Sequence, residues 1–164
     1  MENFSFKNVS FAYPEQENKA LRNISFKVNQ GEFLILCGPS GCGKSTLLRH
    51  LKTCFTPHGV LTGEILFGGK ALNEVDERTQ SQEIGFVLQS PENQVVTDKV
   101  WHELAFGLES LGYDTPTIRR RVAEVAAFFG IENWFYKNVT ELSGGQKQLL
   151  SLASVMAMSP KILV

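Results

Sequence analysis

The chain has 164 residues, of which 43% are hydrophobic and 20% are charged, and its formal net charge is −1. This composition is ordinary for a globular domain with its own core, and the charge balance gives no sign of a nucleic-acid-binding surface. No apolar run reaches the ~18 residues of a membrane-spanning helix, and the N-terminus lacks the features of a secretory signal. The three cysteines, an odd number without zinc-type pairs, indicate the reduced thiols of a cytosolic protein.

Two segments near the N-terminus alternate apolar and polar residues. Residues 3–13 and residues 24–28 both follow this pattern, which predicts two half-buried antiparallel strands. The polar segment Pro14–Lys19 is expected to form the turn between them. Tyr13 ends the first strand, where its ring is placed to stack on a purine, although taken alone it fits a packing role better.

Residues 38–46 fit the phosphate-binding pattern G-x-x-x-x-G-K-[ST]. The loop consists of Gly38, Pro39, Ser40, Gly41, Cys42, Gly43, Lys44, Ser45 and Thr46. Its glycines let backbone N–H groups turn inward around an anion. Lys44 is expected to reach the β- and γ-phosphates, and the Ser45 hydroxyl to bind Mg²⁺. A buried strand is predicted over Phe33–Cys37, and an apolar helix is predicted after the loop.

The next stretch predicts two more strands around a polar segment. Gly63–Phe67, followed by Gly68–Lys70, indicates a strand and a hairpin turn. Residues 73–82 indicate a solvated helix or loop, and Ile84–Gln89 indicates a buried strand. Because ligands of α/β sheets bind beyond the carboxyl ends of the strands, Gln89 is placed to reach a metal ion or its water. A lone glutamine there is otherwise an ordinary loop residue.

Residues 95–140 are expected to be mainly helical and to lie apart from the sheet. Apolar residues recur at helical spacing from Val100 to Leu111 and again from Thr117 to Phe129. The second of these segments begins with the basic run Arg119–Arg121, which is interpreted as a solvated face.

A second glycine motif, Leu142–Gln146, precedes another apolar helix. Ser143 is a natural N-cap for that helix. An ordinary capped helix does not need Gly144 and Gly145, since each costs ~1 kcal/mol inside a helix. The motif therefore indicates a ligand that approaches the backbone closely, and the free N–H groups there suit an anion. The helix is expected to end before Pro160, where a new apolar strand begins.

Together these motifs resemble the ATP-binding cassette (ABC) family over essentially the whole chain. The matching positions are Tyr13 for the adenine-stacking aromatic residue, Gly38–Thr46 for the Walker A loop, Gln89 for the Q-loop and Leu142–Gln146 for the LSGGQ signature. Their order and spacing match the family. The resemblance implies an α/β fold with a P-loop NTPase core, an antiparallel β subdomain and an inserted helical subdomain.

The resemblance also implies the domain layout and the roles of the site residues. Residues 1–94 would form the antiparallel β region and P-loop core, 95–145 the helical subdomain, and 146–164 the signature helix and a following strand. Two cassettes would form a head-to-tail dimer with ATP between them. The catalytic residues would be Lys44, Gln89 and, acting in trans, Ser143, with Gly144, Gly145 and Gln146 also binding the partner's ATP. Ser45 and Gln89 would hold Mg²⁺.

A finer resemblance lies in two segments that follow the Q-loop glutamine. Gln89–Gln94 and Val100–Gly107 are similar to the ATPase subunits of energy-coupling-factor importers, which take up cobalt or vitamins. The resemblance implies that residues near Pro91–Trp101 contact a transmembrane coupling protein. The protein would then be peripheral, on the cytoplasmic face of the membrane. The transported solute cannot be read from this chain.

In the family, the Walker B aspartate, the catalytic glutamate and the switch histidine lie beyond the position of Val164. We therefore expect a truncated chain that binds ATP weakly, hydrolyses it negligibly and forms oligomers. Two alternatives remain open: a soluble cassette ATPase that remodels a protein or a ribosome, and a nucleotide-binding module without turnover. The long coiled coil of DNA-repair cassettes is excluded, because residues 90–141 are too few to form it.

Overall fold

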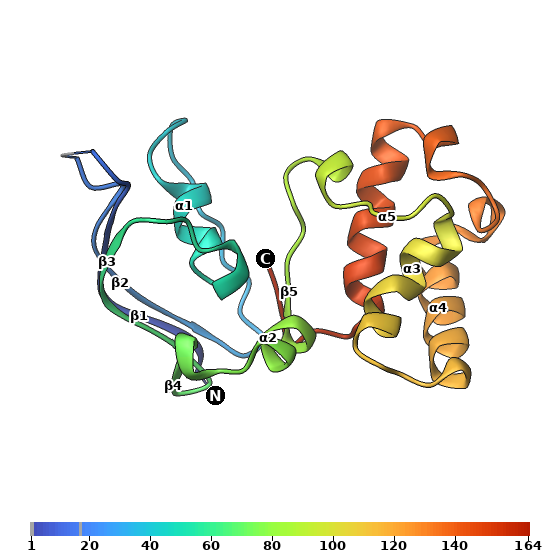
Figure 1. Ribbon diagram of the computed structural model, residues 1–164, viewed down its shortest axis with the longest axis horizontal. Helices are drawn as coiled ribbons and strands as arrows, with labels where there is room; N and C mark the ends of the chain where they lie inside the picture. Colours follow the sequence, from blue (N-terminus) through green and yellow to red (C-terminus); the bar gives the residue numbers. More distant parts are fainter. Residues whose placement is uncertain (1, 17) are drawn as a thin grey trace. The chain divides into compact units, whose positions relative to one another are not determined.

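The computed structural model describes residues 2–16 and 18–164, which fall into two compact units, Met1–Gln80 and Ser81–Val164 (Figure 1). Each unit buries its own set of apolar side chains. The first unit is mainly β-sheet, and the second is mainly helical.

The first unit is built on a four-stranded antiparallel sheet with the order β2-β1-β3-β4 among the described residues. Its strands are β1 (Glu2–Ala12), β2 (Leu21–Asn29), β3 (Val60–Phe67) and β4 (Lys70–Ala71). The two strands and the hairpin expected from the sequence are confirmed. Of the expected turn Pro14–Lys19, Glu17 lies outside the described residues.

A bulge in β1 explains why its apolar side chains all reach the core. Phe4 and Phe6 are buried at even positions, whereas Val9 and Phe11 are buried at odd ones. Strand alternation alone would place these two pairs on opposite faces. The register shifts between Phe6 and Val9, where Asn8 adopts a φ of 51°. One extra residue resets the alternation and returns Phe11 to the buried face.

The strand predicted over Phe33–Cys37 is wrong for the structure described here. This segment has no regular secondary structure and belongs to neither sheet, and Phe33 and Ile35 are 88% and 67% exposed. A strand of a parallel sheet is stabilised by hydrogen bonds from neighbouring strands. No described strand pairs with residues 33–37, so the apolar run alone does not make a buried strand.

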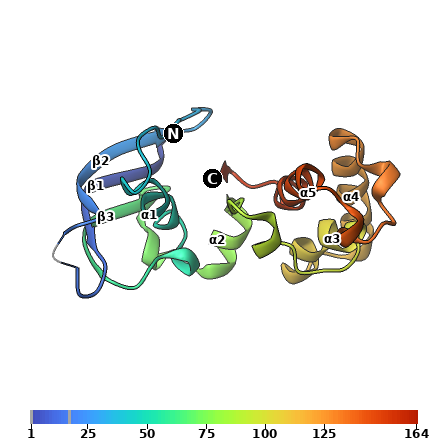
Figure 2. The ribbon, with the colours of Figure 1, turned by 90° about the horizontal axis from the view of Figure 1, so that it is seen from above.

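Helix α1 (Lys44–Arg49) follows the glycine loop and is shorter than its apolar periodicity suggests. The backbone N–H of His50 bonds to the carbonyl of Leu47, which tightens the last turn and ends the helix. Helix α1 packs on β1, since the His50 ring meets the Phe11 ring at 4.6 Å. Figure 2 shows α1 beside the sheet in the first unit.

The polar segment 73–82 contains most of helix α2 (Glu77–Glu83), which confirms a helix there. Gln80 is not solvated, however, and is only 2% exposed. Its side-chain N–H₂ donates to the carbonyls of Leu72 and Val75, and its oxygen accepts from the Thr53 backbone N–H. The buried amide therefore ties the turns at Thr53–Phe55 and Leu72–Glu74 to helix α2. Short 3₁₀ turns occupy Thr53–Phe55, Leu72–Glu74, Pro91–Asn93, Glu132–Trp134 and Val139–Glu141.

The second unit packs three helices around one apolar core. Figures 1 and 2 show these helices side by side. These are α3 (Val100–Ser110), α4 (Thr115–Phe129) and α5 (Gly144–Ala157). The helical spacing predicted for residues 100–111 and 117–129 is confirmed. The core contains Val100, Leu104, Leu108, Val122, Ala126, Ile131, Leu150 and Ala153.

The basic run on α4 is only partly a solvated face. Arg121 lies with its guanidinium carbon 4.7 Å from the centre of the Tyr113 ring and donates to the Met158 carbonyl. The interpretation of Arg119–Arg121 as wholly solvated is therefore wrong for Arg121. Its cation–π contact joins α4 to the turn after α3, and its hydrogen bond joins α4 to the end of α5.

Two short strands complete the second unit. β5 (Ile84–Gly85) pairs in parallel with β6 (Ile162–Leu163), which confirms a strand after Pro160. Backbone hydrogen bonds of 2.8 Å, from Val87 to Val164 and from Val164 to Gly85, continue the pairing. The strand predicted over Ile84–Gln89 is thus correct at its start, but residues 86–89 form a loop.

Candidate functional site

The loop before α1 has the backbone of a phosphate cradle. Gly38, Gly41 and Gly43 all have positive φ, with values of 154°, 78° and 96°. A side chain at Gly43 would place its Cβ 2.6 Å from the carbonyl oxygen of Ala20. Glycine is therefore required at this position by both conformation and space.

The Lys44 ammonium lies over this loop. Its Nζ donates to the carbonyl oxygens of Gly38 and Pro39, each at 2.8 Å. Nζ is also 3.6 Å from the sulfur of Cys42. The positive charge is thus held at the mouth of the loop, where the phosphates of a nucleotide would carry negative charge.

The structure brings Tyr13 together with the loop. The Tyr13 hydroxyl shares a hydrogen bond of 2.9 Å with the Thr46 hydroxyl, the last residue of the motif. Its ring packs edge-on against Phe11, with ring centres 5.0 Å apart. The aromatic residue at the end of β1 and the phosphate loop therefore belong to one local arrangement in the first unit.

Ser45 is the residue in this unit that fits a magnesium ion. It lies in the first turn of α1 with an exposed side chain, directly after Lys44. A hydroxyl oxygen is a hard ligand of the kind that Mg²⁺ prefers, and the ion keeps several waters when it binds a nucleotide. Among the described residues no cluster of three or more His, Cys, Asp or Glu side chains forms a separate metal site.

The signature motif in the second unit forms a capping box at the start of α5. The Ser143 hydroxyl accepts from the Gln146 backbone N–H at 3.3 Å, and the Gln146 side chain accepts from the Ser143 N–H at 2.8 Å. The predicted N-cap role of Ser143 is therefore confirmed. A Cβ at Gly144 or Gly145 would meet nothing within 4 Å. No contact within the chain requires these glycines, so space remains for a ligand to approach the backbone.

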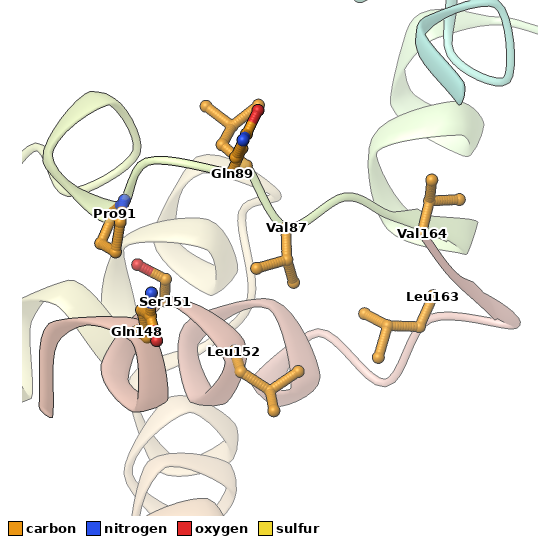
Figure 3. A pocket seen from close by; sticks show the side chains of 9 residues that line it. Val87, Gln89, Pro91, Gln148, Ser151, Leu152, Leu163 and Val164 are labelled. Atoms are coloured by element: carbon orange, nitrogen blue, oxygen red, sulfur yellow. The ribbon is translucent and has the colours of Figure 1, made fainter. Parts of the chain in front are cut away.

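Gln89 lies on the loop that follows β5, at the rim of an open pocket of about 450 Å³. Figure 3 shows the Gln89 side chain directed away from α5. The opposite wall comes from α5, with Gln148, Ser151 and Leu152. The pocket thus places the Q-loop residue next to the signature helix within one unit.

Sequence reasoning missed Gln94, which fixes this loop on α5. Its side-chain oxygen accepts from the Leu88 N–H at 2.8 Å, and its nitrogen donates to the Ser151 carbonyl at 3.3 Å. Only the resemblance in Gln89–Gln94 drew attention to it. A glutamine in a polar loop carries no local signal of a contact with a helix that begins about 50 residues later.

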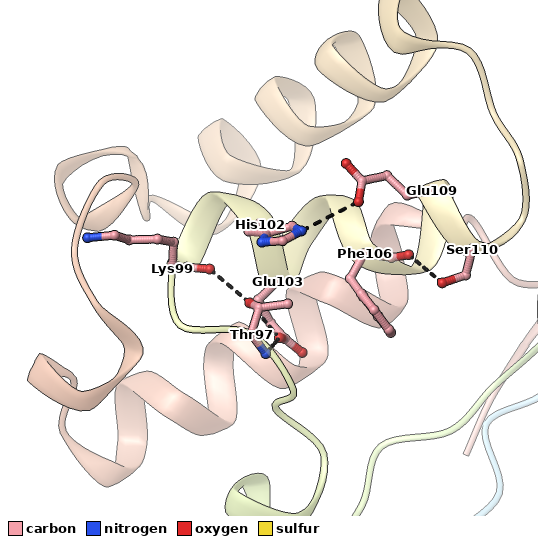
Figure 4. A network of polar contacts seen from close by, with 7 residues as sticks. All are labelled: Thr97, Lys99, His102, Glu103, Phe106, Glu109 and Ser110. Atoms are coloured by element: carbon pink, nitrogen blue, oxygen red, sulfur yellow. Dashed lines mark hydrogen bonds and ion pairs between the residues drawn. The ribbon is translucent and has the colours of Figure 1, made fainter.

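A second missed residue, Glu103, shapes the segment that leads into α3. Its carboxylate is 4% exposed, and one oxygen accepts from the N–H groups of Val96 and Thr97 and from the Thr97 hydroxyl. Figure 4 shows Glu103 beside Thr97, whose single hydroxyl proton has the Lys99 carbonyl as an alternative acceptor at 3.1 Å. This bonding fixes residues 96–99. Val96 and Trp101 remain 63% and 39% exposed around it.

These features define a P-loop NTPase with two glycine motifs, and the comparisons place it in a family. A family model described as "ABC transporter" matches residues 21–164. The chain therefore belongs to the ABC transporter family. The P-loop NTPase fold with an antiparallel β region and a helical region, which the sequence predicted, is confirmed by a solved relative. This is cbiO1 of Clostridium perfringens, described as part of the ABC transporter complex cbiONQ, with a TM-score of 0.84 and 28% identity.

The chain spans only part of the length of the curated relatives that it matches. A Bacillus anthracis protein with the name ABC transporter ATP-binding protein is 47% identical over 158 residues, covering 96% of this chain and 29% of that protein. The energy-coupling factor transporter ATP-binding protein EcfA of Syntrophomonas wolfei is 36% identical, covering 98% of this chain and 58% of that protein. The cbiO1 match covers 99% of this chain and 64% of cbiO1.

Among the residues that the structure describes, no helix has both the length and the apolar character needed to cross a lipid bilayer.

Proposed function

We propose that the chain forms the nucleotide-binding part of an ABC-type ATPase that energises a membrane transporter. The observation that carries this proposal is the glycine loop over which Lys44 is held by two carbonyl oxygens. Lys44 and the loop N–H groups would neutralise the charge on the transferred phosphoryl group. The Tyr13 ring would stack on the adenine.

The remaining site residues divide between metal binding and the second cassette. Ser45 and Gln89 would hold Mg²⁺, which supplies charge neutralisation at the β- and γ-phosphates. Ser143, Gly144, Gly145 and Gln146 would bind the γ-phosphate of a nucleotide on a second ABC subunit. The open space at both glycines supports this role, because a phosphate must come close to the backbone.

We further propose the energy-coupling-factor type of importer, for which the names of EcfA and cbiO1 are the support. The segment Pro91–Trp101 would contact the transmembrane coupling protein at the cytoplasmic face of the membrane. The exposed side chains of Val96 and Trp101 supply apolar area for such a contact. In this layout residues 1–94 form the P-loop core, 95–145 the helical subdomain, and 146–164 the signature helix with its strand.

The test is ATP hydrolysis and membrane-partner recovery by the protein expressed in its native host. We expect turnover that Lys44→Ala abolishes, and recovery of an integral membrane protein that Trp101→Ala reduces. Turnover without any membrane partner would favour the soluble remodelling ATPase. ATP binding without turnover would favour a nucleotide-binding module.

A further inference from the structure

Four residues of the first unit form a closed ring of contacts that joins the end of β1 to the P-loop helix. Tyr13 and Thr46 share a hydrogen bond of 2.9 Å, and His50 and the Thr46 carbonyl share one of 2.7 Å. Phe11 closes the ring, with its centre 5.0 Å from Tyr13 and 4.6 Å from His50. Phe11 and His50 are each 1% exposed.

The hydrogen-bond pattern fixes how His50 takes part. Its backbone N–H bonds to Leu47, which leaves the carbonyl of Thr46 without the usual helical partner. The imidazole Nδ1 fills that place. Because a carbonyl only accepts, Nδ1 carries the proton, and Nε2 is the bare nitrogen. Nε2 is buried without a hydrogen-bond partner.

We propose that His50 is a positioning residue for recognition of the nucleotide base. Its Nδ1–H holds the Thr46 backbone, and its ring face supports Phe11, so that together they fix the Tyr13 ring beside the P-loop. The proposal rests on the proposed function, in which Tyr13 is the platform for adenine. It goes further, because it assigns to the buried His50 the role of holding Tyr13 in place without contacting the nucleotide.

The ring acts on the base side of the site and not on the phosphate cradle. The cradle is formed by backbone groups of residues 38–44 and by the Lys44 ammonium. The hydrogen-bond and ring partners described for His50 are Thr46, which ends the glycine motif after the cradle residues 38–44, and Phe11. The backbone of Gly59 also lies close to the Phe11 ring, because a Cβ at Gly59 would be 2.6 Å from it. A change at His50 is therefore transmitted to Tyr13 through two fixed contacts.

The test compares two ligands that differ in the base. The protein is titrated with MgATP and with magnesium tripolyphosphate, which offers the phosphates alone. His50→Asn keeps an N–H donor for Thr46 but removes the ring, whereas His50→Phe keeps a ring but removes the donor. Each is expected to weaken MgATP binding about tenfold, or ~1.4 kcal/mol, while tripolyphosphate binding changes less than about twofold. Tyr13→Ala should likewise weaken MgATP binding and leave tripolyphosphate binding nearly unchanged.

His58→Asn is the matched control, because it makes the same chemical change at an exposed histidine of the same unit, and it should change neither affinity. Equal loss of both ligands in the His50 variants, or no loss of MgATP, would overturn the proposal. The proposed function fails in a different way: the unaltered protein would bind neither ligand, or would bind both independently of Lys44.

A measurement on the unaltered protein covers the case in which a variant does not fold. Histidine ¹⁵N NMR, with His58 and His102 assigned by substitution, should show His50 as the neutral Nδ1–H form. Its signals are expected to shift with MgATP and to stay unchanged with tripolyphosphate. Signals that respond to both ligands alike, or to neither, would contradict the role assigned to His50.

Discussion

Replacing Glu103 by alanine should loosen the segment that leads into α3 while leaving the helix itself in place. Glu103 is 4% exposed, and its Oε2 accepts from Val96 N–H at 3.1 Å, Thr97 N–H at 2.9 Å and the Thr97 hydroxyl at 2.9 Å. Alanine removes the acceptor of all three donors: the two N–H groups are left without this partner in a partly buried setting, whereas the Thr97 hydroxyl can still donate to the Lys99 carbonyl.

The size of the effect follows from those three bonds. A buried donor left without a partner costs about 1–3 kcal/mol, and water can reach the exposed side of Val96. We therefore expect a loss of ~2–4 kcal/mol in the unfolding free energy of the second unit. Glu103→Gln retains an oxygen that can accept, so its expected loss is smaller, ~1 kcal/mol.

Hydrogen exchange and urea unfolding provide the assay. In Glu103→Ala the amides of Val96 and Thr97 should exchange about 10–100-fold faster, while Leu104 and Leu108 keep most of their protection. Glu109→Ala is the matched control on the same helix. The Glu109 side chain is exposed, and its described ion pair is with His102 at 3.6 Å, so the control should change stability by less than ~0.5 kcal/mol. Unchanged exchange at Val96 and Thr97 in Glu103→Ala would refute the reasoning.

Three further predictions concern the phosphate loop, the buried histidine and the Q-loop. Gly43→Ala should lose nucleotide binding and ~1–2 kcal/mol of stability, because φ is 96° and the new Cβ would meet the Ala20 carbonyl; calorimetry and thermal unfolding would check this. Burial lowers the pKa of His50 from its usual 6.5, so the unfolded chain takes up the proton first. The contribution of His50 to the unfolding free energy of the first unit should be complete above about pH 6.5 and should decrease as the pH falls below that value. Urea unfolding from about pH 5 to 8 should show that His50→Phe lacks this dependence of the unfolding free energy on pH. Gln94→Ala should cost ~1–2 kcal/mol and speed exchange at the Leu88 amide, which loses its acceptor; unchanged exchange there would contradict the contact.

The parts of the fold that the sequence predicted are those set by local patterns. The apolar spacing of residues 100–111 correctly predicted a helix, because α3 buries one apolar face against α4 and α5. The glycine loop was recognised because a backbone with positive φ, as at Gly41 and Gly43, strongly favours glycine, so the residue type itself indicates the conformation. Ser143 was recognised as a cap because its bond to Gln146 spans three residues.

The parts that sequence reasoning missed depend on partners far along the chain. An apolar run such as Phe33–Cys37 indicates a strand only if other strands pair with it, and no described strand does. The role of Arg121 depends on the Tyr113 ring, which comes from another turn. The sequence pattern does not single out Glu103, because its bonds to the backbone of residues 96–97 do not alter the apolar spacing of the helix.

The most direct test of the account is MgATP binding to the complete protein before and after Lys44→Ala. Isothermal titration calorimetry should show one nucleotide per chain, with affinity reduced at least about tenfold by the substitution, because the ammonium over the loop is lost. Lys70→Ala, which removes an exposed lysine of the same unit, should bind normally. Equal affinity in all three proteins would contradict the assignment of residues 38–46 as the nucleotide site.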